Sequence, residues 1–399
     1  MPSAGASAAG MGGSTPNPNS GGASGAGLSG APGSSGTDSG GTNNGGASSG
    51  GDAGDPSGAS AGSAGSAAGI GGQDMYPLMK VLPLFTAADV PAKGPMESPS
   101  SKQGWTPPTT LPTRTGNGIA QHPMLYVGEN YNRIILVNGG KVIWTYDTLP
   151  GYELDDVWMM SNGNILYSHM TFIEEITPKK EVVWHYKPAS GEIHTLQPIG
   201  LDKVLFVENA LPMARVRIYN KKTATFEVDH PLAAAGTQHG QFRRFRMTGA
   251  GTYLGSFLSG AKVVEFDSHF KELWSFATPS PWSGVRLKNG NTLIQDEKES
   301  TAKEVDPAGQ VVWQLARSGL TLPAGTMMGN TQTSERLSNG NTVMFGNGGT
   351  NVNNIQAVEV TPDKQIVWVL QDWMHLGDAT SAQFLDEPGY PEIPGDTNH

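Results

Sequence analysis

A short motif recurs three times in the chain and sets its architecture. The three copies are residues Ser161–Leu166, Lys288–Leu293 and Ser338–Val343, and each contains Asn-Gly-Asn. Roughly 20 to 30 residues after each copy, a run of β-branched residues ends in tryptophan, at Trp184, Trp313 and Trp368. A unit that recurs every 40–50 residues or so is typical of propellers and solenoids. The chain is therefore predicted to be a repeat protein.

Each repeat contains four short runs of β-branched and aromatic residues, separated by Gly, Asn, Asp or Pro. Such runs are typical of strands joined by tight turns. Five complete units can be aligned, over residues 155–186, 193–229, 241–276, 282–315 and 333–370.

The two ends of the repeat region together supply a sixth unit. Residues 124–128, 132–138 and 141–146 match the second, third and fourth strands of a repeat, whereas residues 380–386 match a first strand. Pairing the C-terminal strand with the three N-terminal strands closes the ring and leaves no long open edge. We therefore predict an all-β fold over residues 121–390: a six-bladed β-propeller with four antiparallel strands per blade.

The remaining segments have other compositions. Residues 1–73 contain no lysine, arginine, histidine or aromatic residue and are rich in glycine, serine and alanine. Such a segment cannot bury enough apolar surface to order itself, so it is predicted to be a disordered tether. Residues 74–120 are rich in proline and are predicted to pack on the domain as irregular structure. Residues 391–399 are predicted to be a C-terminal tail.

Charge and cysteine content exclude several classes of function. The net charge is −10 and the basic residues form no run, so no nucleic-acid partner is expected. Cysteine is absent, which excludes disulfides, thiol nucleophiles and thiolate metal sites. No apolar stretch is long enough to span a membrane, and residues 1–30 lack the regions of a signal peptide.

The Gly/Ser/Ala-rich leader resembles the spacer of a bacterial surface lipoprotein whose signal and lipidated cysteine have been removed. We accordingly expect an extracytoplasmic protein, at the cell surface or in the periplasm, that contacts the membrane only through the removed lipid anchor. We also expect a monomer. The alternative is a disordered tail on a cytosolic protein.

Aromatic residues recur in phase on the outermost strand of the repeats. They are Trp144, Trp184, Phe226, Trp274, Trp313 and Trp368. Repetition at equivalent outer positions favours packing between blades over a cofactor cage or a sugar platform, because a large aromatic side chain fills the widening wedge.

Titratable side chains concentrate where the chain enters the innermost strands. In a propeller these entry loops surround one mouth of the axial channel, where function is usually found. We predict the ligand site there, with His194 and His239 as candidate catalytic residues and with these candidate binding residues: Asp155, Asp156, Gln241, Trp282, Thr333 and His375. Glu153 and Glu192 enter the same mouth.

Three arginines, Arg246, Arg286 and Arg336, each precede the Leu or Met that closes an inner strand. One interpretation is an anion-binding cradle, because guanidinium groups match sulfate, phosphate or carboxylate. The other is that each arginine belongs to the repeat and pairs with an acid of a neighbouring blade. All three are kept as candidate binding residues.

Two units, residues 286–296 with 304–307 and residues 336–345 with 359–362, resemble the repeats of bacterial arylsulfotransferase-like and quinoprotein-like propellers. The resemblance covers nearly all of residues 120–386. It implies six blades and a channel histidine that carries a sulfuryl group between two phenols. On this resemblance His239 would be the nucleophile, His194 the second histidine and Arg246 the anion partner.

Cofactor sites are less well supported. Quinoprotein dehydrogenases use eight blades and adjacent cysteines, so no quinone cofactor is expected in this six-bladed, cysteine-free chain. Glu192, His194 and His239 suit a zinc or manganese ion by residue type, but no local spacing fixes a complete ligand set. No metal or other cofactor is therefore predicted.

Three functions stay open. The first is sulfuryl transfer to phenolic compounds. The second is a lyase or hydrolase of anionic polysaccharide that uses the same rim histidines. The third is a non-catalytic surface propeller that binds a protein, a glycan or a small molecule. In each case the expected partner is a small aromatic or glycan ligand at the channel mouth.

Overall fold

A computed structural model describes residues 122–399, except for 130–132, 139–140, 149–152, 348–352 and 372–377. The predicted tether (residues 1–73), the predicted proline-rich segment (74–120) and His375 lie outside the described residues. Within the described part, the chain forms strands and one 3-10 turn, Arg317–Gly319. No helix there is long and apolar enough to cross a membrane.

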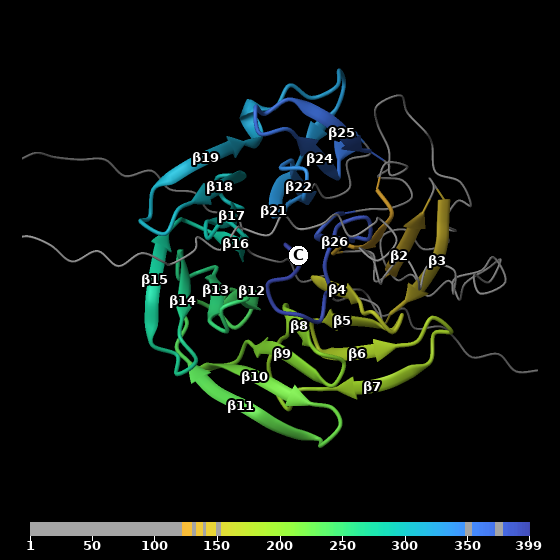
Figure 1. Ribbon diagram of the computed structural model, residues 1–399, viewed down its shortest axis with the longest axis vertical. Helices are drawn as coiled ribbons and strands as arrows, with labels where there is room; N and C mark the ends of the chain where they lie inside the picture. Colours follow the sequence, from red (N-terminus) through yellow and green to blue (C-terminus); the bar gives the residue numbers. More distant parts are fainter. Residues whose placement is uncertain (1–121, 130–132, 139–140, 149–152, 348–352, 372–377) are drawn as a thin grey trace, which may run out of the picture. The chain divides into compact units, whose positions relative to one another are not determined.

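Six four-stranded antiparallel sheets form a ring of blades (Figure 1). This confirms the predicted six-bladed β-propeller. From the innermost strand outward, blade 1 contains β26 (Ser381–Phe384), β1 (Met124–Val127), β2 (Arg133–Asn138) and β3 (Lys141–Asp147); blade 2 contains β4 (Asp156–Met159), β5 (Ile165–His169), β6 (Phe172–Ile176) and β7 (Val182–Tyr186); blade 3 contains β8 (Leu196–Ile199), β9 (Lys203–Glu208), β10 (Ala214–Asn220) and β11 (Thr225–Leu232).

The other three blades follow the same order. Blade 4 contains β12 (Phe242–Met247), β13 (Tyr253–Phe257), β14 (Lys262–Phe266) and β15 (Glu272–Ala277); blade 5 contains β16 (Pro281–Arg286), β17 (Thr292–Asp296), β18 (Thr301–Val305) and β19 (Val311–Ala316); blade 6 contains β21 (Asn330–Arg336), β22 (Thr342–Asn347), β24 (Ala357–Val360) and β25 (Ile366–Leu370). A short parallel pair joins β20 (Met327–Met328), which precedes blade 6 in the chain, to β23 (Asn354–Ile355), which lies between β22 and β24 in the chain.

The ring closes as the sequence predicts. Strand β26, from the C-terminal end, pairs antiparallel with β1, and Met124 lies opposite Phe384. Blade 1 then joins blade 2 through Gln383, whose side chain accepts a hydrogen bond from the Met159 amide (2.6 Å). Closure removes the two edges that an open array of strands would expose.

The Asn-Gly-Asn motif forms the turn between the first and second strands of a blade. Gly163, Gly290 and Gly340 have φ values of 87°, 87° and 89°, a region that glycine adopts without steric cost. In the Ser161–Leu166 copy the first asparagine, Asn162, accepts a hydrogen bond from the Asn164 amide (3.0 Å). The second, Asn164, donates to Glu175 on the third strand (2.6 Å). The motif therefore fixes both the turn and a carboxylate.

That carboxylate belongs to a recurring contact between blades, which we call the inter-blade triad. Its members are a glutamate on the third strand, the tryptophan opposite it on the fourth strand, and a cation from the next blade. The four sets are Glu175, Trp184 and Lys221; Glu265, Trp274 and Arg286; Glu304, Trp313 and Arg336; and Glu359, Trp368 and His122. In blade 5, for example, Arg336 lies 2.8 Å from Glu304 and 5.3 Å from the Trp313 ring.

The tryptophans pack between blades, as predicted from their phase. Trp144 is fully buried among residues of blade 2, including Val157 and Tyr167, and donates to the Pro178 carbonyl (2.8 Å). Trp313 likewise donates to the Pro362 carbonyl of blade 6 (2.9 Å).

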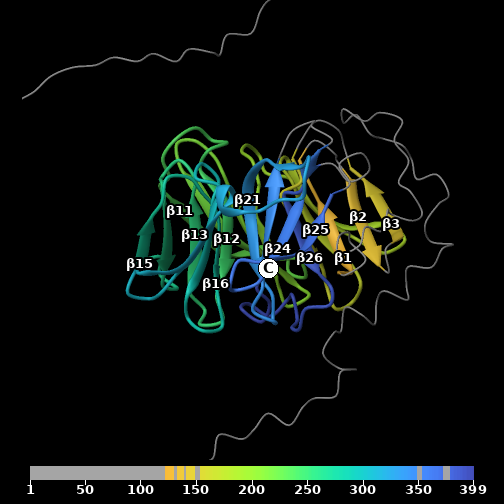
Figure 2. The ribbon, with the colours of Figure 1, turned by 90° about the horizontal axis from the view of Figure 1, so that it is seen from above.

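The C-terminal segment, residues 387–399, crosses one face of the ring. It contacts the turns that follow the innermost strands of five blades, and its partners there are Ser161, Gly200, Gly249, Lys288 and Ser338. Figure 2 shows this blue segment on the lower face of the ring. The chain ends at the centre of the ring (Figure 1), where His399 is only 4% exposed. The entry loops that carry the predicted site lie at the opposite ends of the same inner strands.

Replacing Trp144 tests the inter-blade packing. Trp144→Ala removes a fully buried indole, so we expect the free energy of unfolding to fall by about 3–5 kcal/mol. The control, Val183→Ala, changes a side chain on β7 that is 53% exposed and should cost less than about 0.5 kcal/mol. Urea denaturation measures both. Equal losses for the two variants would contradict the packing role of Trp144.

His122 predicts a pH dependence of stability. Burial alone would lower its pKa, but hydrogen bonds to Asp386 and Glu359 raise it from 6.5 to about 9. The folded state therefore binds the proton more tightly than the unfolded state, so the stabilisation is fully present below pH 6.5 and is lost as the pH rises towards 9. We expect the thermal midpoint of His122→Gln to fall furthest below that of the native protein at pH 6 and to approach it near pH 9. A constant difference over this range would contradict the assignment.

Candidate functional site

Polar side chains gather in two clusters along the innermost strands. The mouth cluster, at the end of the ring where the chain enters the inner strands, contains Glu129, Glu153, Asp155, Glu192, His194, His239 and Arg243. The axial cluster, deeper in the ring, contains Asp156, Thr195, Arg244, Arg246, Glu335 and His399. Asp155 belongs to the mouth cluster and Asp156 to the axial cluster, because successive residues of an extended chain point in opposite directions.

His194 is the buried centre of the mouth cluster and is only 1% exposed. Its Nδ1 donates to Asp155 (2.6 Å) and its Nε2 donates to Glu192 (3.0 Å), with Glu153 3.3 Å from Nδ1. Burial and Arg243 would lower the pKa of His194, but these carboxylates raise it to about 10. His194 is therefore an imidazolium at neutral pH, with both ring nitrogens occupied.

His239 is the solvent-facing member, with 47% of its side chain exposed. Its Nδ1 lies 2.9 Å from the same Glu192 oxygen that His194 contacts. Arg243 donates from Nη2 to His239 Nε2 (2.6 Å), and the guanidinium lies 4.6 Å from the Trp282 ring. Since an arginine only donates, Nε2 is the unprotonated nitrogen of His239 and Nδ1 donates to Glu192.

Negative charge exceeds positive charge in the mouth cluster. Burial raises the pKa of Glu129 well above its usual value, and the carboxylates of Asp155 and Glu153 raise it further. Burial and Glu153 likewise raise the pKa of Asp155, although His194 opposes this effect. Uncompensated like charges at short range favour the neutral acid. The cluster is thus short of cations.

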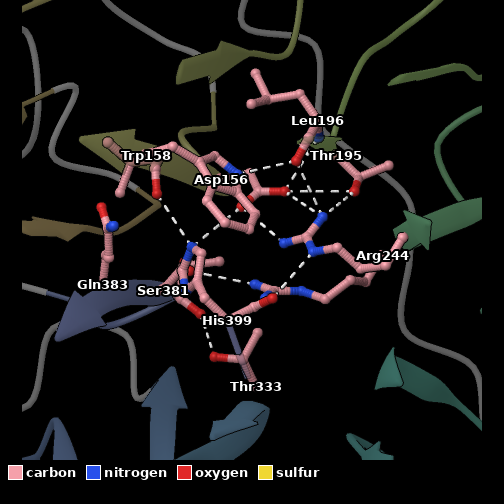
Figure 3. Close-up of polar contacts among 12 residues, drawn as sticks. Asp156, Trp158, Thr195, Leu196, Arg244, Thr333, Ser381, Gln383 and His399 are labelled. Atoms are coloured by element: carbon pink, nitrogen blue, oxygen red, sulfur yellow. Dashed lines mark hydrogen bonds and ion pairs between the residues drawn. The ribbon is translucent and has the colours of Figure 1, made fainter. Parts of the chain in front are cut away.

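The axial cluster is built around a buried ion pair. Arg246 lies 2.8 Å from Asp156, and both side chains are at most 3% exposed. Arg246 and Arg244 hold the pKa of Asp156 well below its usual range, against the effect of burial. The ring of His399 contacts Trp158 (Figure 3). Its Nε2 donates to the Val157 carbonyl (3.0 Å). The C-terminal segment therefore completes this cluster.

The three predicted arginines do not form a cradle. Arg286 and Arg336 lie between blades in the inter-blade triad, as the repeat interpretation predicts. Arg246 lies opposite Leu254, whereas Arg286 and Arg336 lie opposite Thr292 and Thr342, which places Arg246 one residue earlier in the register. A shift of one residue turns a side chain to the other face of its strand, so Arg246 joins the axial cluster instead.

Other predicted binding residues serve the scaffold in this structure. Gln241 is fully buried and exchanges two hydrogen bonds with the backbone of Ala210 (3.0 and 2.9 Å). Trp282 is covered by Arg243. Thr333, labelled in Figure 3, is buried and donates to the Thr380 carbonyl. Their predicted binding roles stay predictions.

The sequence predicted that His194, His239 and Asp155 share one mouth, and they lie together in the structure. Several neighbours of these residues were not predicted. Glu129 follows β1 at the other end of the repeat region, and nothing in its local sequence marks it. Arg243 could have been found from its position two residues after Gln241, because alternate residues share a face. His399 belongs to no repeat, and only the folded chain places it at the axis.

The comparisons with known proteins support the scaffold. No protein-family model matches the chain, and no curated protein matches it in sequence. A solved protein of unknown function from Bacteroides caccae is similar, with 20% identity and a TM-score of 0.58 over 65% of this chain and 98% of that chain. Virginiamycin B lyase from Staphylococcus aureus has 9% identity and a TM-score of 0.45 over 61% of this chain and 83% of its own. BamB from Moraxella catarrhalis has 13% identity and a TM-score of 0.36 over 56% and 64%. Such identities show the fold alone, and no finding assigns the chain to the arylsulfotransferase-like family.

Asp156→Ala tests the axial ion pair. Without Asp156, the buried Arg246 keeps its charge but loses its carboxylate, so we expect a loss of about 3–5 kcal/mol in the free energy of unfolding. Asp229→Ala is the control, because its carboxylate is 34% exposed and each of its pairs, with Arg215 and with Arg217, should contribute at most about 1 kcal/mol. Chemical denaturation distinguishes them. A loss below about 1 kcal/mol for Asp156→Ala would show that other partners hold Arg246.

Proposed function

We propose that this chain is a ligand-binding β-propeller whose ligand contacts the mouth cluster, and that the ligand is a glycan without negative charge. The observation that carries the proposal is the exposed His239, held by Glu192 and Arg243 above a carboxylate-rich group of buried side chains. No other described part of the ring joins so many titratable groups to a side chain that reaches solvent.

The charge of the site selects against anions. The two firmly cationic groups, His194 and Arg243, already contact carboxylates or His239, and the pKa values of Glu129 and Asp155 are raised. A sulfate, phosphate or uronate would add negative charge to a site that already has too much. Neutral or amino sugars avoid this repulsion.

The hydrogen-bonding groups of the mouth suit hydroxyl groups. Carboxylate oxygens accept from sugar hydroxyls, and each carboxylate offers about four acceptor positions. Glu153 and Glu192 keep 24% and 17% of their side chains exposed, beside His239. A glycan ligand also fits the extracytoplasmic location expected from the Gly/Ser/Ala-rich leader.

Sulfuryl transfer through His239 receives less support from this geometry. A nucleophilic imidazole needs a free ring nitrogen, whereas His239 Nε2 accepts from Arg243 and both nitrogens of His194 donate to carboxylates. Arg246, the expected anion partner, pairs with Asp156 in the axial cluster. The excess of negative charge at the mouth also disfavours a lyase or hydrolase that acts on anionic polysaccharide.

Glycan binding can be tested with the full chain on an array that includes neutral, amino, uronate and sulfated oligosaccharides. We expect binding to neutral or amino sugars, and a fall in affinity of about fivefold or more in His239→Ala, since one hydrogen bond contributes about 1 kcal/mol. His185→Ala is the matched control: its side chain is 45% exposed and bonded to Glu174 at 3.0 Å, but it lies on outer strand β7. It should bind as the native chain does.

Two results would overturn the proposal. One is binding that is restricted to sulfated or uronate glycans. The other is turnover of 4-nitrophenyl sulfate with a phenol acceptor that is lost in His239→Ala, which would establish sulfuryl transfer.

A further inference from the structure

We infer that the mouth cluster holds a hard divalent cation, bound by the oxygen atoms of Glu129, Glu153 and Asp155 with the side-chain carbonyl of Gln332. This deepens the proposed function, because it places a cation at the mouth where the glycan is proposed to bind. The three carboxylates each offer one oxygen, and these oxygens lie within 4.8 Å of one another. They come from two loops of the neighbouring blades 1 and 2, one after β1 and one before β4.

Buried oxygen atoms without partners point to a ligand at this place. Asp155 is 4% exposed and uses Oδ2 for His194, whereas its Oδ1 has no hydrogen-bond partner among the described residues. Gln332 is 1% exposed and donates from Nε2 to Glu129 (2.9 Å), whereas its Oε1 has no such partner. A buried acceptor that loses water without gaining a partner is unfavourable. A cation among the three carboxylates would satisfy Asp155 Oδ1, and Gln332 is joined to the same group through Glu129.

Charge supports the same assignment. Four carboxylates belong to the mouth cluster: Glu129, Glu153, Asp155 and Glu192. The cations that face them are His194, on Asp155 and Glu192; Arg243, whose Nη1 is 3.9 Å from Glu153; and Arg244, whose charge acts on Asp155. A divalent cation supplies the positive charge that this group of acids lacks.

The ligand chemistry favours calcium-like ions over zinc. A second set of possible ligands, Glu153, His194 and His239, also lies within 4.8 Å. In that set both nitrogens of His194 donate to carboxylates, and the Arg243 guanidinium occupies His239 Nε2. A metal there would have to displace these contacts. Carboxylate and amide oxygens, by contrast, are the ligands that Ca²⁺ and Mg²⁺ prefer.

Calorimetric titration of the chelator-treated full chain with CaCl₂, MgCl₂ and ZnCl₂ tests the inference without any glycan. We expect Ca²⁺ to bind at one site, and Glu129→Gln and Glu153→Gln each to weaken it by about tenfold or more. Glu174→Gln is the matched control: it also removes one hydrogen-bonded carboxylate, but one bound to His185 and Tyr167 on blade 2, outside the mouth. Its affinity for Ca²⁺ should match the native value, and circular dichroism confirms that each variant folds.

The outcomes separate this inference from the proposed function. Absence of Ca²⁺ and Mg²⁺ binding up to millimolar concentrations, or native affinity in both mouth variants, overturns the cation site. Zinc binding that is lost in His239→Ala overturns it in favour of the histidine set. Glycan binding that persists in EDTA leaves the proposed function standing if the cation site fails, whereas Ca²⁺ binding without glycan binding leaves only the cation site.

Discussion

The contact on which this ring depends is the inter-blade triad. A propeller blade cannot bury its faces alone, so stability requires each blade to fit the next. In this chain a third-strand glutamate, held by the second asparagine of the Asn-Gly-Asn turn or by a threonine, meets a cation of the next blade over a tryptophan face. One set of side chains thereby links the turn, the blade and its neighbour. This explains why the turn motif and the tryptophan recur together in the sequence.

The two blades that lack the complete triad differ from the other four at the glutamate position. In blade 3, Tyr219 lies opposite Phe226, where Glu265 lies opposite Trp274 in blade 4. The residue of blade 4 in the register position of Arg286 is Met247. In blade 1, Leu136 lies opposite Trp144 in place of the glutamate. In blade 2, Met159 occupies the register position of Arg286. In blade 1 a cation of the next blade remains, since Lys180 lies 5.8 Å from the Trp144 ring, although no glutamate lies opposite that tryptophan.

The two ends of the inner strands serve different purposes. At the turn end, residues 387–399 contact five blades and complete the axial cluster with His399. At the entry end, His239 reaches solvent above buried acids. The asymmetry explains why the arginines divide as they do: Arg246 faces the axis beneath the C-terminal segment, whereas Arg243, on the same strand, stacks on Trp282 at the mouth. A search for ligands should therefore begin at the mouth.

The sequence by itself determined the blade count, the strand order and the closure by β26, because each blade repeats one local pattern and the missing first strand of blade 1 appears at the far end. It also placed His194, His239 and Asp155 at one mouth, since strand entry points follow from the repeat. It could not place Glu129, Gln332 or His399, nor show that Arg246 is one residue out of register with Arg286. Those positions depend on which side chains meet across the axis. That geometry arises only when all six blades close, because no local pattern records the distance between residues on opposite blades.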